Sequence, residues 1–158
     1  MKRNDKIIAV AQGAMIAAIY AAATYASSAL GIAYGQVQFR FSEALTALAV
    51  LTPAAVPGLT VGCIIGNIGS PMGVWDIIFG SLATLLASLS ARALRRVRFK
   101  GIPLLSIIMP VIFNALIVGA EIALLTPTDG AKITLFAISA LEVGAGELAV
   151  CLAGGIPI

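Results

Sequence analysis

The chain has 158 residues, of which 60% are hydrophobic and only 11% are charged, with a formal net charge of +3. Ordinary soluble domains carry about 25% charged residues, so this composition excludes a soluble globular protein and favours a membrane protein. We expect one transmembrane domain over residues 1–158, because this length leaves no room for a second domain of any size.

The first apolar segment, residues 7–33, is long enough to cross a bilayer and too long for a cleaved signal. Small residues recur along it at every fourth position, on two adjoining stripes: Ala9, Gly13, Ala17 and Ala21, and Ala14, Ala18, Ala22 and Ala26. Stripes of this kind allow helices to approach closely in lipid. The partner is either another helix of this chain or a separate subunit, and both alternatives stay open.

The next segment, residues 36–42, alternates strictly between polar and apolar side chains. Gln36, Gln38, Arg40 and Ser42 fall on one side, and Val37, Phe39 and Phe41 on the other. A period of two predicts an extended segment. It can line a pocket with amides and a guanidinium, although an ordinary connecting loop is the simpler alternative.

Residues 44–91 form an apolar region that is interrupted by Pro53, by Pro57-Gly58 and by the glycine-rich turn 69–73. These interruptions leave three segments, two of them short for a membrane span. Two further spans are predicted at residues 102–125 and 133–155. The predicted fold is therefore an all-α membrane protein with six transmembrane helices.

Basic residues precede the first predicted span and follow the fourth: Lys2, Arg3 and Lys6, and Arg92, Arg95, Arg96, Arg98 and Lys100. The positive-inside rule places both clusters on the cytoplasmic side, which requires an even number of crossings between them. We therefore expect a multi-pass protein of the cell membrane with both termini cytoplasmic. Because the positive charge flanks spans, a nucleic-acid partner is not expected.

Polar side chains lie inside or at the ends of these apolar segments, where a charged group costs roughly 2.5–3.5 kcal/mol on insertion scales. Gathered in the outward half of the bundle, they predict a polar chamber for a ligand. The candidate substrate-binding residues are Gln38, Arg40, Glu43, Asn67, Asp76, Asn114, Glu121 and Glu147.

Asn114 and Glu121 are seven residues apart and share a helix face, whereas Glu142 lies about 140° from Glu147 around its helix and is left out of the site. The alternative is internal structure, with Arg40 paired to Glu43 or Asp76. One arginine cannot neutralise four carboxylates, so the set favours a ligand rich in N–H donors or positive charge, such as a planar base with guanine-like donors.

The chemistry that the sequence lacks narrows the function further. The chain has no histidine, and Cys63 and Cys151 have no metal-ligand spacing, so no metal or other cofactor is expected. It also lacks the phosphate-loop and nucleophile-elbow motifs. We therefore predict no enzyme activity, and concentrative uptake would need ATPases on other chains or an ion gradient.

The chain resembles the QueT family, substrate-binding S components of energy-coupling factor (ECF) importers thought to take up queuosine precursors. The resemblance lies in residues 37–46, 52–58, 66–73 and 76–85, in residues 113–119 with Glu121, and in Gly146-Glu147-Leu148. It covers nearly the whole chain, and its specificity comes from the combination of these pieces.

The resemblance implies a six-helix S component that binds a deazaguanine base, in its aminomethyl or cyano form or as queuine, from outside. It further implies docking through Ala14 and Ala18 on a transmembrane T subunit, which two cytosolic ATPases drive. A free-standing ion-coupled carrier is the alternative function, and an intramembrane enzyme using two carboxylates is a more distant one.

Overall fold

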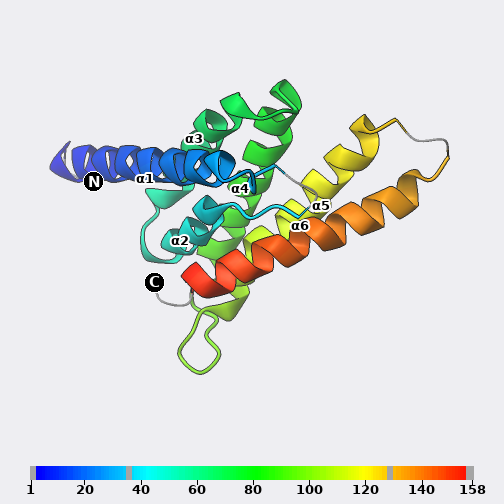
Figure 1. Cartoon of the computed structure of the whole chain (residues 1–158). Helices are drawn as coiled ribbons and strands as arrows, with labels where there is room; N and C mark the ends of the chain where they lie inside the picture. Colours follow the sequence, from blue (N-terminus) through cyan, green and yellow to red (C-terminus); the bar gives the residue numbers. More distant parts are fainter. Residues whose placement is uncertain (1–2, 35–36, 128–129, 156–158) are drawn as a thin grey trace.

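A computed structural model describes residues 3–34, 37–127 and 130–155 of the chain, and its regular structure in these ranges is helical (Figure 1). The elements in chain order are α1 (Arg3–Ala29), η1 (Phe41–Ala47), α2 (Leu48–Leu51), α3 (Ala55–Gly66), η2 (Asn67–Gly69), α4 (Val74–Leu94), α5 (Leu104–Leu125) and α6 (Lys132–Gly155). The all-α prediction is confirmed. The predicted first, fifth and sixth segments correspond to α1, α5 and α6, with ends that differ by a few residues.

The interrupted middle region folds as three helical segments: η1 with α2, then α3, then α4. Pro53 lies in the turn between α2 and α3, as expected. The expected interruption at Pro57-Gly58 is wrong, because both residues belong to α3. A proline in the first turn of a helix removes no intrahelical hydrogen bond, since the amide at that position has no partner.

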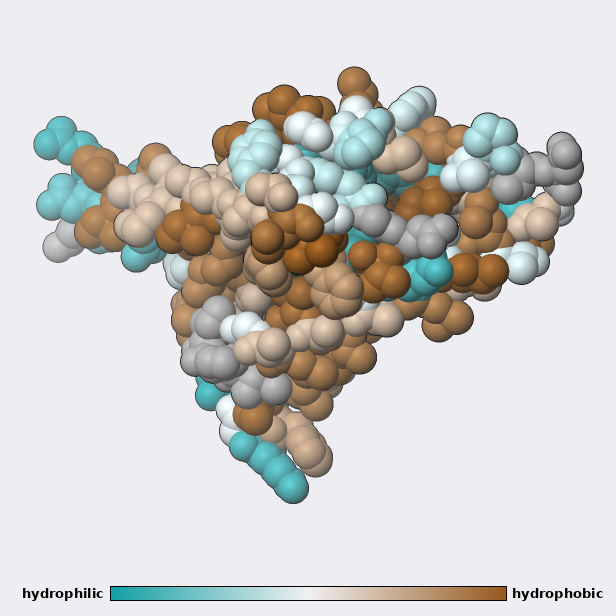
Figure 2. Space-filling view, viewed as in Figure 1, coloured by the Kyte–Doolittle hydropathy of each residue, from teal (hydrophilic) through white to brown (hydrophobic). Residues whose placement is uncertain are grey.

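Four of the helices in the described ranges, α1, α4, α5 and α6, are long and apolar enough to cross a membrane. The two shorter apolar helical segments, Phe41–Leu51 and Ala55–Asn67, are not. Much of the visible surface is apolar, and hydrophilic atoms gather at the N-terminal end of α1 and at the tip of the turn after α4 (Figure 2). The protein is therefore membrane-embedded, while the six-span count stays a prediction.

The two small-residue stripes of α1 have different environments. Ala17 and Ala21 are buried. Three glycines of α3, spaced four residues apart, lie against α1: Gly58, Gly62 and Gly66. A Cβ on Gly62 would lie 2.7 Å from Cβ of Tyr20 and 2.8 Å from the carbonyl oxygen of Ala17, so only glycine permits this approach. The second stripe, from Ala14 to Ala26, is exposed along α1.

The C-terminal end of α1 is closed by a Schellman motif around Gly31, whose φ is +73°. The amide of Gly31 donates to the Ser28 carbonyl at 2.9 Å, and the amide of Ile32 donates to the Ser27 carbonyl at 3.1 Å. This motif ends the helix and turns the chain back toward η1.

Burial alternates in the returning segment: Gln38, Arg40 and Ser42 are buried, whereas Val37 and Phe41 are exposed. This matches the predicted period of two. The extended conformation stops earlier than predicted, because η1 begins at Phe41. Gln36, the first residue of the predicted pattern, lies outside the described residues.

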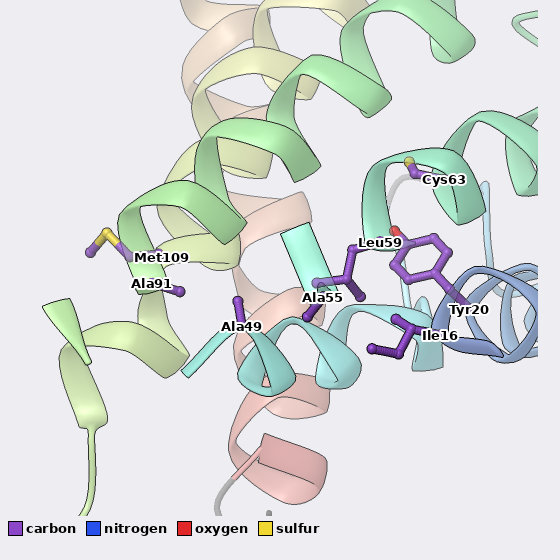
Figure 3. Close-up of a cluster of buried hydrophobic side chains, with 8 residues drawn as sticks. All are labelled: Ile16, Tyr20, Ala49, Ala55, Leu59, Cys63, Ala91 and Met109. Atoms are coloured by element: carbon purple, nitrogen blue, oxygen red, sulfur yellow. The ribbon is translucent and has the colours of Figure 1, made fainter. Parts of the chain in front are cut away.

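A hydrophobic core joins five helices. Its buried side chains come from α1, α2, α3, α4 and α5 (Figure 3): Ile16, Tyr20, Ala49, Ala55, Leu59, Cys63, Ala91 and Met109. The η1 segment contacts α1, α3, α4, α5 and α6, so it lies at the centre of the bundle. Its position places Glu43 among all of these helices.

Candidate ligand-binding site

The eight predicted site residues all lie in the described part of the chain, and each is buried. Their exposed fractions range from 0% for Glu121 to 6% for Gln38. Four of them are carboxylates, and Arg40 is the one buried basic residue among the described residues. The structure arranges them as an outer group that borders a cavity and an inner group beside the core.

Asp76, in the first turn of α4, is the centre of the outer group. Its carboxylate lies 3.5 Å from the Arg40 guanidinium and accepts a hydrogen bond from the hydroxyl of Ser70. Its backbone carbonyl accepts a 2.9 Å hydrogen bond from the side-chain amide of Asn67. Asn67 fits against α4 because residue 80 is glycine, since a Cβ there would lie 2.6 Å from the Asn67 amide nitrogen.

Arg40 is held on three sides. Its Nε donates to the Ala33 carbonyl at 3.1 Å, its carbon Cζ lies 5.1 Å from the centre of the Tyr34 ring, and its Nη2 faces Asp76. The Tyr34 hydroxyl donates to the Gly66 carbonyl at 2.8 Å. Burial raises the pKa of Tyr34, which lies outside the helices, so the phenol stays protonated as this donor.

A cavity of about 330 Å³ opens beside the outer group, between the chain before η1, the start of α4, and helices α5 and α6. This volume is at the small end of the range for small-molecule sites. Gln38, Asp76 and Glu121 of the predicted set line it. The remaining wall combines apolar and polar side chains: Tyr34, Pro71, Met72, Val118, Ile122, Thr126, Leu135, Ile138, Ser139 and Glu142.

Glu121 is the least satisfied group of this wall. It is fully buried, and neither of its carboxylate oxygens has a hydrogen-bond partner among the described residues. The Asp76 carboxylate lies close enough to repel it, and Arg40, which attracts it, already faces Asp76. An unpaired buried carboxylate is costly, so this arrangement favours a ligand that brings N–H donors or a positive charge.

The inner group surrounds Glu43 at the start of η1. The Tyr20 hydroxyl donates to one of its carboxylate oxygens, and Thr46 donates to the other at 3.3 Å. Glu147 of α6 and Asn114 of α5 lie next to Glu43. In the described ranges, the Asn114 amide nitrogen and one Glu147 oxygen are buried without a partner. Neither Asn114 nor Glu147 lines the cavity, and a bridging water would satisfy both atoms.

The segment that carries Gln38 packs directly on α6. A Cβ on Gly146 would lie 2.2 Å from the Gln38 carbonyl oxygen and 3.1 Å from a methyl carbon of Val37. The glycine therefore allows the backbone of this segment to touch the helix, one residue before Glu147. This contact fixes one wall of the cavity.

Glu142 was excluded by its angle from Glu147, yet the structure places it in the cavity wall. It continues a stripe with Leu135, Ile138 and Ser139 at helical spacing, and this stripe is a different face of α6 from that of Glu147. The exclusion assumed that all site residues of a helix share one face. The stripe through Ser139 was the sequence signal that could have found Glu142.

Sequence reasoning also missed the polar face of α1 formed by Tyr20, Thr24 and Ser27. Tyr20 bonds Glu43, the Thr24 hydroxyl donates to Ser42 at 2.8 Å, and the Ser27 hydroxyl accepts from the Phe41 amide at 3.1 Å. Their spacing of four and three residues marks one helix face.

Three kinds of group thus converge on this site: carboxylates, amides and one guanidinium. They suit hydrogen bonding to the edge of a planar, donor-rich molecule. Among the described residues, no cluster of three or more histidine, cysteine or acidic side chains is placed to hold a metal ion, and both cysteines are buried free thiols.

Comparison with known proteins gives two matches. The model of a family described as QueT transporter matches residues 10–158. The queuosine precursor transporter QueT of Lactococcus lactis subsp. cremoris (strain MG1363) is 36% identical over 84 residues, which are 53% of this chain and 49% of that protein. The match therefore spans about half the length of this curated relative. No solved structure matches the chain.

Proposed function

Because the chain belongs to the QueT transporter family, we propose that it is the substrate-binding membrane subunit of an importer for a queuosine precursor. The ligand is a deazaguanine base in its aminomethyl or cyano form, or queuine. The single observation that supports this most strongly is the unpaired, fully buried carboxylate of Glu121 in the wall of a cavity. The Lactococcus relative is named for queuosine precursor transport.

The proposed recognition uses each kind of polar group. Glu121 accepts hydrogen bonds from adjacent N–H groups on the guanine-like edge of the base, in bidentate fashion. Gln38 closes the cavity from the segment before η1, and Arg40 orients Asp76 beside it. Asn67 holds the first turn of α4 in place, so it acts by positioning Asp76.

The inner group extends the proposed site toward the core. In this proposal the Asn114 amide nitrogen donates to a carbonyl oxygen of the base and one Glu147 oxygen accepts from its N–H groups; neither atom makes a direct hydrogen bond in the described structure. Glu43 is already bonded by Tyr20 and Thr46, so we assign it to holding this part of the site together through η1.

Binding across a panel of bases tests the proposed function. We expect the detergent-purified chain to be stabilised against heat by the aminomethyl and cyano precursors or by queuine, and not by guanine or riboflavin. Because the four buried carboxylates outnumber the one buried cation, Arg40, the cationic aminomethyl form should stabilise the protein more than the neutral cyano form. A well-folded sample that none of the three precursors stabilises would contradict the proposed substrate.

For the transport step we propose the ECF arrangement: a T subunit in the membrane and two cytosolic ATPases, with this chain as a non-enzymatic subunit. Both termini and the turn after α4 are then cytoplasmic, and the cavity opens outward. Ala14 lines an apolar groove of about 540 Å³ between α1 and α3, on the stripe that also holds Ala18. This groove and stripe are the proposed docking face.

Replacing Ala14 with tryptophan should leave precursor binding intact but abolish uptake, because the bulky ring blocks close helix approach. Leu89→Trp, on a half-exposed position of α4, is the matched control and should preserve uptake. The measurements are ligand binding by the purified chain and precursor uptake by cells. Uptake that persists in the Ala14→Trp variant would contradict the docking face.

The alternative function is a free-standing, ion-coupled carrier. It is distinguished by uptake in cells that produce this chain but lack any T subunit and partner ATPases. We expect no concentrative uptake in those cells, and uptake that dissipates with the ion gradient would favour the carrier.

A further inference from the structure

The turn that follows α4 is a short β-hairpin closed by one isolated bridge between Phe99 and Ile102. The amides and carbonyls of Phe99 and Ile102 exchange two hydrogen bonds, of 2.9 and 3.0 Å. The two residues between them, Lys100 and Gly101, have φ values of +51° and +87°. Positive φ at both central positions is the requirement of a type I′ hairpin turn, so this segment has a defined shape.

The hairpin projects from the bundle and exposes both basic and apolar side chains. Residues 96–102 are all exposed, including Phe99 at 67% and Val97 at 48%. Arg96, Arg98 and Lys100 alternate with these two apolar side chains along the sequence. The Lys100 ammonium lies 5.8 Å from the centre of the Phe99 ring, so positive charge and apolar surface adjoin on the hairpin. In Figure 2 the tip of the hairpin is hydrophilic and stands away from the apolar body.

The basic residues of this region differ in whether they bind other groups of the protein. The Arg92 guanidinium donates to the carbonyls of Ala49 and Val50 at 3.3 and 3.1 Å, where it closes the end of α2, and Arg95 donates to the Arg92 carbonyl. Arg96, Arg98 and Lys100 make no ion pair with the described residues. Their charges are open to an external anion.

Arg98 also borders a hollow. A cavity of about 250 Å³ lies between the hairpin, α2 and the end of α6, and Arg98 lines it together with the apolar side chains of Leu51, Ile102 and Pro103. Leu51 is 61% exposed. A cation beside a hollow that also has apolar side chains in its wall fits a ligand with an anionic head and a hydrocarbon tail.

We propose that this hairpin and hollow form a binding site for an anionic phospholipid. Arg98 holds the phosphodiester, Lys100 and Arg96 add positive potential around it, and Phe99 inserts at the level of the headgroups. The acyl chain lies along Leu51 and Ile102. The site is separate from the proposed substrate site, and it does not depend on which base the protein binds.

Lipid retention by the full chain tests the site. The protein is exchanged into a zwitterionic detergent, supplied with phosphatidylglycerol or phosphatidylcholine of the same acyl chains, and analysed by native mass spectrometry. We expect the native chain to retain phosphatidylglycerol preferentially. The double variant Arg98→Gln, Lys100→Gln should retain at least fivefold less. The control Arg3→Gln, Lys6→Gln, with an equal loss of charge at the N-terminal end of α1, should retain as much as the native chain.

Three results would overturn the proposal. Equal retention of the two lipids by the native chain would remove the headgroup preference, and equal losses in both double variants would show a general charge effect. Stabilisation by inorganic phosphate that equals stabilisation by phosphatidylglycerol would assign the site to a free anion. Since the substituted side chains are exposed, both variants should melt like the native chain in the absence of lipid.

Discussion

Replacing Glu121 with glutamine is expected to leave the ligand-free protein at least as stable as the native chain, while precursor binding weakens roughly 10- to 150-fold. The stability follows because the substitution removes a buried carboxylate whose two oxygens have no partner in the described structure. The loss of affinity follows because a hydrogen bond to a charged group contributes about 1.5–3 kcal/mol. Thermal unfolding without ligand and a binding isotherm measure the two effects.

The opposite signs of these two effects separate a binding role from a structural one. Glu43 provides the comparison, because Tyr20 and Thr46 already bond its oxygens and Glu43→Gln should not stabilise the ligand-free protein. If Glu121→Gln instead lowers the melting temperature and leaves affinity unchanged, Glu121 belongs to internal structure rather than to the ligand site.

Replacing Gly146 with alanine is expected to weaken precursor binding at least tenfold and to destabilise the protein by about 1–3 kcal/mol. The added Cβ would lie 2.2 Å from the Gln38 carbonyl oxygen, so the segment from Val37 to Arg40 must move away from α6. This movement displaces Gln38 from the cavity wall and Arg40 from Asp76.

Gly144→Ala is the matched control, two residues earlier on the same helix. Its Cβ would meet only the Ala115 side chain, at an ordinary 3.4 Å, and glycine in a helix interior costs about 0.5–1 kcal/mol relative to alanine. The control variant should therefore bind normally and unfold at the same or a higher temperature. Equal behaviour of the two variants would show that the contact between α6 and the Gln38 segment is not required for binding.

Helices could be predicted from the sequence where a long apolar segment was enough to define them. The helices α1, α5 and α6 follow from long apolar segments bounded by polar or glycine-containing turns. The middle region was harder, because its proline positions have opposite consequences: Pro53 separates two helices, whereas Pro57 lies in the first turn of one. Only the position of the helix start decides which consequence applies.

The family was identified from the sequence and is confirmed by the family match over residues 10–158. Seven of the site residues were chosen because they are polar inside or at the ends of apolar segments, and Gln38 because it lies on the polar side of the alternating segment 36–42; all eight are buried in the structure. Their assignment to a substrate stays a prediction. What the sequence could not supply was their division into an outer and an inner group, since that depends on how η1 packs among five helices.

The two omissions have different physical causes. Glu142 lies on a face of α6 different from that of Glu147, and a helix in a bundle contacts several neighbours, so two of its faces can carry function at once. Tyr20 is seven residues after Gly13 and lies on the same face of α1 as the first small-residue stripe, which Thr24 and Ser27 continue. Polar spacing should therefore be sought on every face, including a face whose small residues already have a packing role.

The most direct test of the account is a structure of the chain with the aminomethyl precursor bound. We predict the base in the cavity between α4, α5 and α6, with the Glu121 carboxylate within hydrogen-bond distance of its N–H groups and Gln38 closed over it. A base bound elsewhere on the molecule, or in the cavity with Glu121 still unpartnered, would contradict the account.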